Sequence, residues 1–189
     1  MISCWQEFLD LYAALPAPSV LEVGSRVWPD LRGHTVRQML YDLNPVVAYT
    51  GFDVMSGDEV DVVGDAHDLA KYFPAGHFDV FLCRATLEHV RRPWVVAAQL
   101  AAVVKPGGIG FVQTHQTFPL HGYPHDYFRF STAALRELFA DDGGWKCLRA
   151  EHEFPCRIVP MENYFPHAQD WNFVGEAYLN SCCLVRRLP

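Results

Sequence analysis

Residues 20–30 read Val-Leu-Glu-Val-Gly-Ser-Arg-Val-Trp-Pro-Asp, an apolar run that ends at Glu22 and Gly24 and then turns polar. A buried parallel strand reads as a continuous apolar run, and ligands of open α/β sheets bind beyond the carboxyl ends of such strands. We therefore predict a strand over residues 19–23, with Gly24 placed where a ligand would approach the backbone.

Further apolar runs at residues 46–53, 60–65, 78–83 and 109–113 predict four more strands. Helical patterns at 35–43, 67–73 and 93–104 separate these runs, and the turn Lys105-Pro-Gly-Gly108 stops the last of the three helices. Strands that alternate with helices predict parallel βαβ units with right-handed crossovers.

The two ends of the chain differ from this repeating pattern. Apolar residues at three- and four-residue spacing predict a helix over residues 3–15, with Ser3 as cap and Pro16 as stop. This helix either packs on the core, which we favour, or covers a substrate pocket. After a helix at 131–139, strands at 145–154 and 177–185 are expected to pair antiparallel at the sheet edge. The long connection between them holds Tyr164, His167 and Trp171, and loops of this length are often functional.

Composition narrows the class of protein. The chain has 189 residues, half of them apolar, which predicts one domain over residues 1–189. Fifteen basic residues against 22 acidic ones give a field that repels polyanions, so we expect no nucleic-acid partner. No signal peptide and no membrane-spanning run is recognisable, which predicts a soluble, cytoplasmic protein. The six cysteines lack zinc-type spacing and are expected to be reduced, with Cys182 and Cys183 on opposite faces of a strand.

Three acidic residues, Glu22, Asp53 and Asp65, lie at or just beyond the ends of successive predicted strands. Carboxylates at these places can bind ribose hydroxyls and an adenine amino group, although each alone is also typical of a turn or helix cap. The first loop has one glycine and lacks the G-x-G-x-x-G pattern that a pyrophosphate requires. A nucleoside with an amino-acid tail and no phosphate fits better.

With these features the sequence resembles the class I S-adenosylmethionine-dependent methyltransferases, and among them the type 11 methyltransferase domains. Residues 21–24, 51–53, 64–69 and 78–89 are similar to motifs I to IV, and residues 105–108 to the turn before the fifth strand. The resemblance covers about residues 20–139. It implies a Rossmann-like α/β fold with a mainly parallel seven-stranded sheet, an antiparallel last strand and helices on both faces. It also implies S-adenosylmethionine as cofactor, bound by the 20–139 core, with residues 145–189 supplying the last strands and a substrate-side loop.

The resemblance also implies which residues contact the cofactor. Gly24 and Ser25 would pass beneath the methionine part, and Glu22 would help to fix its amino group. Asp53 would hold the ribose hydroxyls. The adenine would meet Val54, Met55, Asp65 and the Ala66 amide, and the methionine tail would meet Cys83 and Arg84. Arg26 belongs to the same loop, where it and Trp28 stand in place of glycines that the family often has.

The acceptor side is expected in the run after the fifth strand, residues 115–130, which is rich in histidine and aromatic residues. A hydroxyl acceptor needs a general base, and histidine is the side chain most readily tuned near neutral pH. His115, His121 and His125 form one candidate set, Asp126 is a candidate to orient a histidine, and His89 is a further candidate. Each has an alternative interpretation as a hydrogen-bonded structural residue.

The same run also holds metal-ligand types, since two histidines and one carboxylate can bind a divalent ion. Pro119 and Pro124 prevent a single helix that would present His121 and His125 on one face. From this spacing we expect no metal site.

The predicted function is methyl transfer from S-adenosylmethionine to an oxygen or nitrogen of a small molecule, such as a sugar or a natural-product intermediate. A non-catalytic module that binds S-adenosylmethionine is the alternative. A nicotinamide-dependent oxidoreductase is less favoured because the glycine fingerprint is absent. The acceptor and the oligomeric state, monomer or homodimer, stay open.

Overall fold

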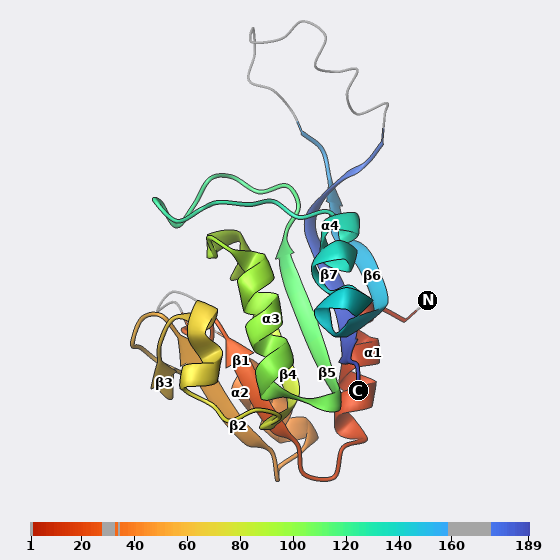
Figure 1. Ribbon diagram of the computed structural model, residues 1–189. Helices are drawn as coiled ribbons and strands as arrows, with labels where there is room; N and C mark the ends of the chain where they lie inside the picture. Colours follow the sequence, from red (N-terminus) through yellow and green to blue (C-terminus); the bar gives the residue numbers. More distant parts are fainter. Residues whose placement is uncertain (1, 28–32, 34, 159–174) are drawn as a thin grey trace, which may run out of the picture.

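The sheet contains seven strands and is described by the computed structural model over residues 2–27, 33, 35–158 and 175–189. The strand bounds are β1 Ser19–Val23, β2 Ala48–Asp53, β3 Val62–Val63, β4 Phe78–Arg84, β5 Val104–His115, β6 Trp145–Cys156 and β7 Ala177–Arg187. Their order across the sheet is β3-β2-β1-β4-β5-β7-β6 (Figure 1). Trp28 and the long connection that holds Tyr164, His167 and Trp171 lie outside the described residues.

Strand direction agrees with the sequence analysis. The pairs from β3 to β5 are all parallel, whereas β7 runs antiparallel to both of its neighbours, β5 and β6. The predicted fold class, a mainly parallel seven-stranded sheet with an antiparallel last strand, is confirmed. The carboxyl ends of β1, β2, β4 and β5 therefore meet at one edge of the sheet.

Helices cover both faces of this sheet (Figure 1). The α-helices are α1 Cys4–Ala13, α2 Val36–Leu43, α3 Pro93–Val103 and α4 Thr132–Leu138, and the 3₁₀ turns are η1 Ala66–Lys71, η2 Leu87–His89 and η3 Asp141–Gly143. The side chains of Ser3, Thr35 and Ser131 cap α1, α2 and α4 by accepting a backbone hydrogen bond. No helix within the described ranges combines the length and apolarity that crossing a membrane requires.

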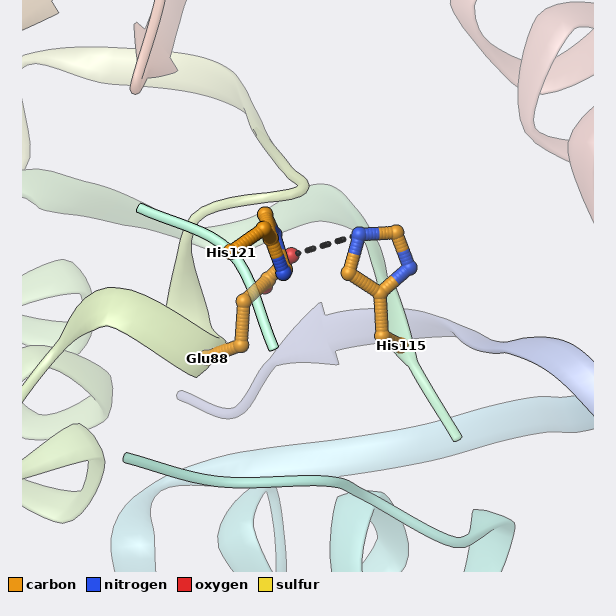
Figure 2. A group of neighbouring side chains, drawn as sticks. All are labelled: Glu88, His115 and His121. Carbon is orange, nitrogen blue, oxygen red and sulfur yellow. Dashed lines mark ion pairs between the residues drawn. The ribbon is translucent and has the colours of Figure 1, made fainter. Parts of the chain in front are cut away.

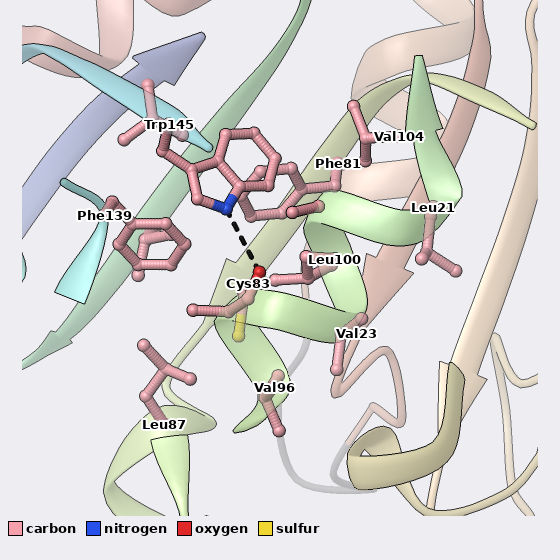
Figure 3. Packing of buried hydrophobic residues seen from close by; sticks show 14 of the residues in the cluster. Leu21, Val23, Phe81, Cys83, Leu87, Val96, Leu100, Val104, Phe139 and Trp145 are labelled. Atoms are coloured by element: carbon pink, nitrogen blue, oxygen red, sulfur yellow. Dashed lines mark hydrogen bonds between the residues drawn. The ribbon is translucent and has the colours of Figure 1, made fainter. Parts of the chain in front are cut away.

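Each face has its own hydrophobic core. On one face α1 and α2 bury Phe8, Tyr12 and Leu40 against the sheet. On the other, α3 and α4 pack over a larger cluster centred on Phe81 and Trp145 (Figure 3). The expected packing of the N-terminal helix on the core is confirmed by this burial.

Three elements differ from the sequence expectation in form. The segment after β3 is a 3₁₀ turn because Asp68 has non-helical dihedrals, with φ −131°. Strand β3 has only two residues. Strand β5 begins at Val104 and takes in the turn at 105–108 as a bulge, since its pairing with β4 shifts between Phe78 and Val80.

Candidate active site

The loop after β1 is fixed by Gly24, whose φ is +81°. A Cβ placed there would come 1.9 Å from the hydroxyl oxygen of Thr86, which follows β4. The Gly24 N–H also donates to the carbonyl of Phe52 on β2, at 2.8 Å. Only glycine tolerates both the dihedral and the close approach, so the chain passes tightly over the edge of the sheet here.

Glu22 is a buried acid at the end of β1, with 6% of its surface exposed. Burial raises its pKa to about 7, against the opposing effects of a hydrogen bond from the Tyr49 hydroxyl and the charge of Arg84. The guanidinium of Arg37 lies over the Tyr49 ring at 4.5 Å and pairs with Glu59 at 2.6 Å. Glu22 is therefore one member of a charged network that links β1, β2 and α2.

A hollow of about 330 Å³ opens beside this network. Its lining includes four predicted cofactor residues, Glu22, Gly24, Ser25 and Arg26. The Ser25 hydroxyl is buried and has no hydrogen-bond partner in the part of the chain that the structure describes. A buried hydroxyl without a partner is costly, so it is a suitable contact for a polar ligand.

Asp53 ends β2 and ties the two loops of this edge together. Its carboxylate accepts hydrogen bonds from the backbone N–H of Arg26 at 3.3 Å and of Met55 at 2.9 Å. A carboxylate has acceptor sites for further partners, so ribose hydroxyls could still bind. Val54 and Met55 beside it are 69% and 55% exposed, which leaves apolar surface free for a flat ring.

Asp65 has a local structural role. Its carboxylate caps η1 by accepting from the backbone N–H of His67, and it contacts the His67 ring at 2.6 Å. Partial burial opposes the charge, but these contacts lower the pKa of Asp65. Ala66, whose amide was also predicted to contact the adenine, is the first residue of η1. Neither Asp53 nor Asp65 lines the 330 Å³ hollow.

The two predicted residues at the end of β4 lie in different surroundings. Cys83 is completely buried in the core, where burial raises the pKa of its thiol, so only its backbone could reach a ligand. Arg84 lies 5.4 Å from the ring of Trp5 on α1, and both residues line a second hollow of about 270 Å³. The N-terminal helix thus also contributes one ring to the ligand edge.

A cluster of Glu88, His115 and His121 lies on the acceptor side (Figure 2). Glu88 belongs to η2 and is fully buried, and its Oε1 lies 3.2 Å from Nε2 of His115, at the end of β5. His115 stacks on Phe118 with ring centroids 4.0 Å apart, and the His121 ring lies 5.0 Å from the His115 ring. The structure therefore brings two of the three candidate histidines together around a buried carboxylate.

The other candidates are arranged around this cluster. Asp126 accepts a hydrogen bond from the backbone N–H of His121 and forms a bidentate pair with Arg129 at 2.5 and 2.8 Å. This pair lowers the pKa of Asp126 well below its usual range. His125 is exposed, and its ring contacts the Tyr127 hydroxyl. The Nδ1 atom of His89 contacts the His125 carbonyl oxygen, and the His89 ring lies 4.7 Å from the His121 ring.

Several residues at the carboxyl edge of the sheet were not predicted from the sequence. Glu88 was missed because its neighbours in the sequence, His89, Arg91 and Arg92, are those of an exposed polar segment, although the folded chain buries it completely. Tyr49 and Asn180 gave no signal in the sequence. Asn180 faces His115 only because β7 pairs with β5 in that register.

Comparisons with known proteins agree with this geometry. Residues 34–112 match the family described as a methyltransferase domain. This match confirms the predicted resemblance to methyltransferase domains over that part of the chain. No curated protein sequence matches the chain significantly.

Solved structures share the fold at low sequence identity. A SAM-dependent methyltransferase from Archaeoglobus fulgidus superposes with a TM-score of 0.66 and 11% identity, over 96% of this chain and 90% of that one. A protein from Bacillus halodurans classed as a candidate methyltransferase gives 0.63 and 15%, over 97% and 98%. A candidate methyltransferase solved with the Haloferax volcanii activator Trm112 gives 0.57 and 18%, over 98% and 90%. At these identities the likeness establishes a common fold.

Proposed function

We propose that this methyltransferase transfers a methyl group from S-adenosylmethionine to an oxygen or nitrogen of a small molecule. The observation that carries the proposal is the meeting of two features at one sheet edge. The hollow beside Glu22, Gly24 and Ser25 lies at the end of β1, and the histidine cluster lies at the ends of β4 and β5.

The residues at the edge fit the proposed cofactor. The Gly24 backbone and the Ser25 hydroxyl, which has no partner among the described residues, line the hollow, and Glu22 supplies a carboxyl group for an amino group. Asp53 retains acceptor capacity for a ribose, with Val54 and Met55 as an apolar surface for adenine. S-adenosylmethionine, when bound, supplies a methyl group on a positively charged sulfur, and its transfer depends chiefly on alignment of the reactants.

The acceptor would be held by the cluster after β5. His115 and His121 are partly covered, with 14% and 30% of their side chains exposed, so an acceptor that reaches them must be small or offer a narrow group. A histidine of this set would remove the proton from an acceptor hydroxyl. The net charge of −7 also disfavours a nucleic-acid acceptor. Six free cysteines support a reducing compartment such as the cytoplasm.

The second candidate is a non-catalytic module that binds S-adenosylmethionine, and it is supported by the first loop, where Arg26 stands in place of a glycine that the family often has. Both Asp53 oxygens already accept backbone hydrogen bonds, one of them from the loop residue Arg26. Such a module would bind S-adenosylhomocysteine as well as S-adenosylmethionine, and it would need no general base. Turnover on any acceptor would exclude it.

The first test is calorimetric titration of the purified protein with S-adenosylmethionine and with S-adenosylhomocysteine. We expect both to bind, and Asp53→Ala to weaken binding by about 1–3 kcal/mol through loss of charge-assisted hydrogen bonds. Asp58→Ala is the matched control, because it removes the same charge from an exposed position in the following loop. If neither ligand binds, the cofactor assignment is wrong. If Asp53→Ala and Asp58→Ala bind with equal affinity, Asp53 does not contribute to binding.

A further inference from the structure

We propose that Glu88, His115 and His121 bind a divalent transition-metal ion. One atom from each side chain lies within 4.8 Å of the other two, and the three residues come from η2, the end of β5 and the loop that follows β5 (Figure 2). Two imidazoles and one carboxylate form a ligand set that suits zinc, iron and related first-row ions.

The contact between Glu88 and His115 has the geometry of two ligands rather than of a hydrogen bond. Oε1 and Nε2 are 3.2 Å apart, yet Oε1 has no hydrogen-bond partner in the described part of the chain. The ring nitrogen is therefore not directed along the line to the oxygen. Ligand atoms about 2.1 Å from a tetrahedral zinc ion lie about 3.4 Å apart, which is close to the observed spacing.

Each proposed ligand has a second partner that orients it. The Thr114 hydroxyl donates to Glu88 Oε2 at 2.7 Å. The Nδ1 atom of His121 lies 3.1 Å from the Pro119 carbonyl oxygen, which can only accept, so this nitrogen carries the proton and Nε2 is free to bind a metal. The Nδ1 atom of His115 contacts Asn180 Oδ1 at 2.9 Å in the same way. Supporting contacts of this kind are typical of metal-bound histidine and carboxylate.

Electrostatics also favour a cation at this place. The Glu88 side chain is completely buried, and a buried carboxylate requires a positive partner. The nearby guanidinium of Arg129 is engaged by both oxygens of Asp126. Two neutral imidazoles and a metal ion would satisfy Glu88, because the ion supplies the positive charge.

Three protein ligands leave coordination positions for water or for an oxygen of the acceptor. The role in holding an acceptor rests on the proposed function, whereas metal binding itself does not. While an ion is bound, His115 and His121 could not act as the general base, so that role would fall to His125 or His89.

The ligand types within residues 115–126 alone do not predict a metal site, because Pro119 and Pro124 interrupt that run. Glu88, which lies 27 positions before His115 in the chain, was not part of that set.

The test is titration of the chelator-treated protein with Co²⁺, followed by absorption spectroscopy and calorimetry without any cofactor present. We expect one equivalent to bind with the visible bands of nitrogen and oxygen ligands. Glu88→Gln, which keeps the volume and the acceptor for Thr114, and His121→Ala, at a partly exposed position, should each weaken binding at least about tenfold. His125→Ala is the matched control from the same loop, and its Co²⁺ affinity should equal that of the unchanged protein.

Three results would overturn the proposal. These are no Co²⁺ binding by the unchanged protein, unweakened affinity in Glu88→Gln and His121→Ala, and a thiolate-to-cobalt band. The last would place the ion at a cysteine, as in the second group of ligand types among the described residues, Glu151, Glu153 and Cys182. Because the titration uses no S-adenosylmethionine, its outcome is separate from that of the cofactor titration.

Discussion

The protonation of Glu22 couples the stability of the folded protein to pH. Its pKa in the folded protein is about 7 against an ordinary value of 4.5, because it is buried. Between these two values the folded state binds a proton that the unfolded state releases, so the free energy of unfolding falls as pH rises. A shift of this size corresponds to about 3 kcal/mol.

Glu22→Gln should remove this dependence. The variant keeps an acceptor for the Tyr49 hydroxyl but has no charge to bury. We compare the free energies of unfolding of the two proteins at each pH. The value for the unchanged protein minus that for the variant should fall between about pH 4.5 and pH 7 and stay constant above pH 7. Denaturant unfolding at several pH values measures this difference, and a constant difference would contradict it.

Gly24→Ala should damage both stability and cofactor binding. The φ of +81° disfavours any side chain, and the new methyl group would overlap with Thr86. We expect a loss of at least about 1 kcal/mol in the free energy of unfolding and a lower affinity for S-adenosylhomocysteine. Gly143→Ala is the control, because a methyl group at that position would have no neighbour within 4 Å in the part of the chain that the structure describes. Equal behaviour of the two variants would show that the Gly24 loop adapts.

The conformation of the segment from 118 to 129 depends on the side chain of Arg129. The Arg129 guanidinium donates to both oxygens of Asp126 and to the carbonyls of Phe118 and Pro119. Lysine has one charged nitrogen and cannot reproduce this planar set of contacts. We predict that Arg129→Lys accelerates amide hydrogen exchange at His121, whose N–H donates to Asp126, while exchange in β4 stays unchanged. Arg136→Lys, on α4, is the control.

The elements also show what sequence patterns can and cannot predict. The predicted bounds of β1, 19–23, are those observed, because an apolar run between polar ends marks a buried parallel strand. The form of the segment after Asp65 was not predictable, since its 3₁₀ turn depends on the dihedrals of Asp68. The acid positions of Glu22 and Asp53 followed from strand ends. The contact between His115 and Asn180, 65 positions apart, requires the register of β7.

Trp145 joins the C-terminal strands to the rest of the protein. The indole is fully buried between Phe81 and Phe139, and its Nε1–H donates to the Ala97 carbonyl on α3 at 3.0 Å (Figure 3). Trp145→Phe removes this hydrogen bond and leaves a cavity where the larger indole packed, so we expect a loss of about 1–3 kcal/mol in the free energy of unfolding. Trp94→Phe, at a 58% exposed position on α3, is the control and should change it little. Equal losses would contradict the role of the Trp145 contact.

The adjacent thiols of β7 give experimental access to each half of the core. Cys182 is buried with the residues of α1, whereas Cys183 is buried with those of α3 and α4. A thiol-specific reagent reacts with each only after the helices on its own side have separated from the sheet. Labelling rates of variants whose only remaining cysteine is Cys182 or Cys183 would therefore report separately how often each layer opens, without any introduced cysteine.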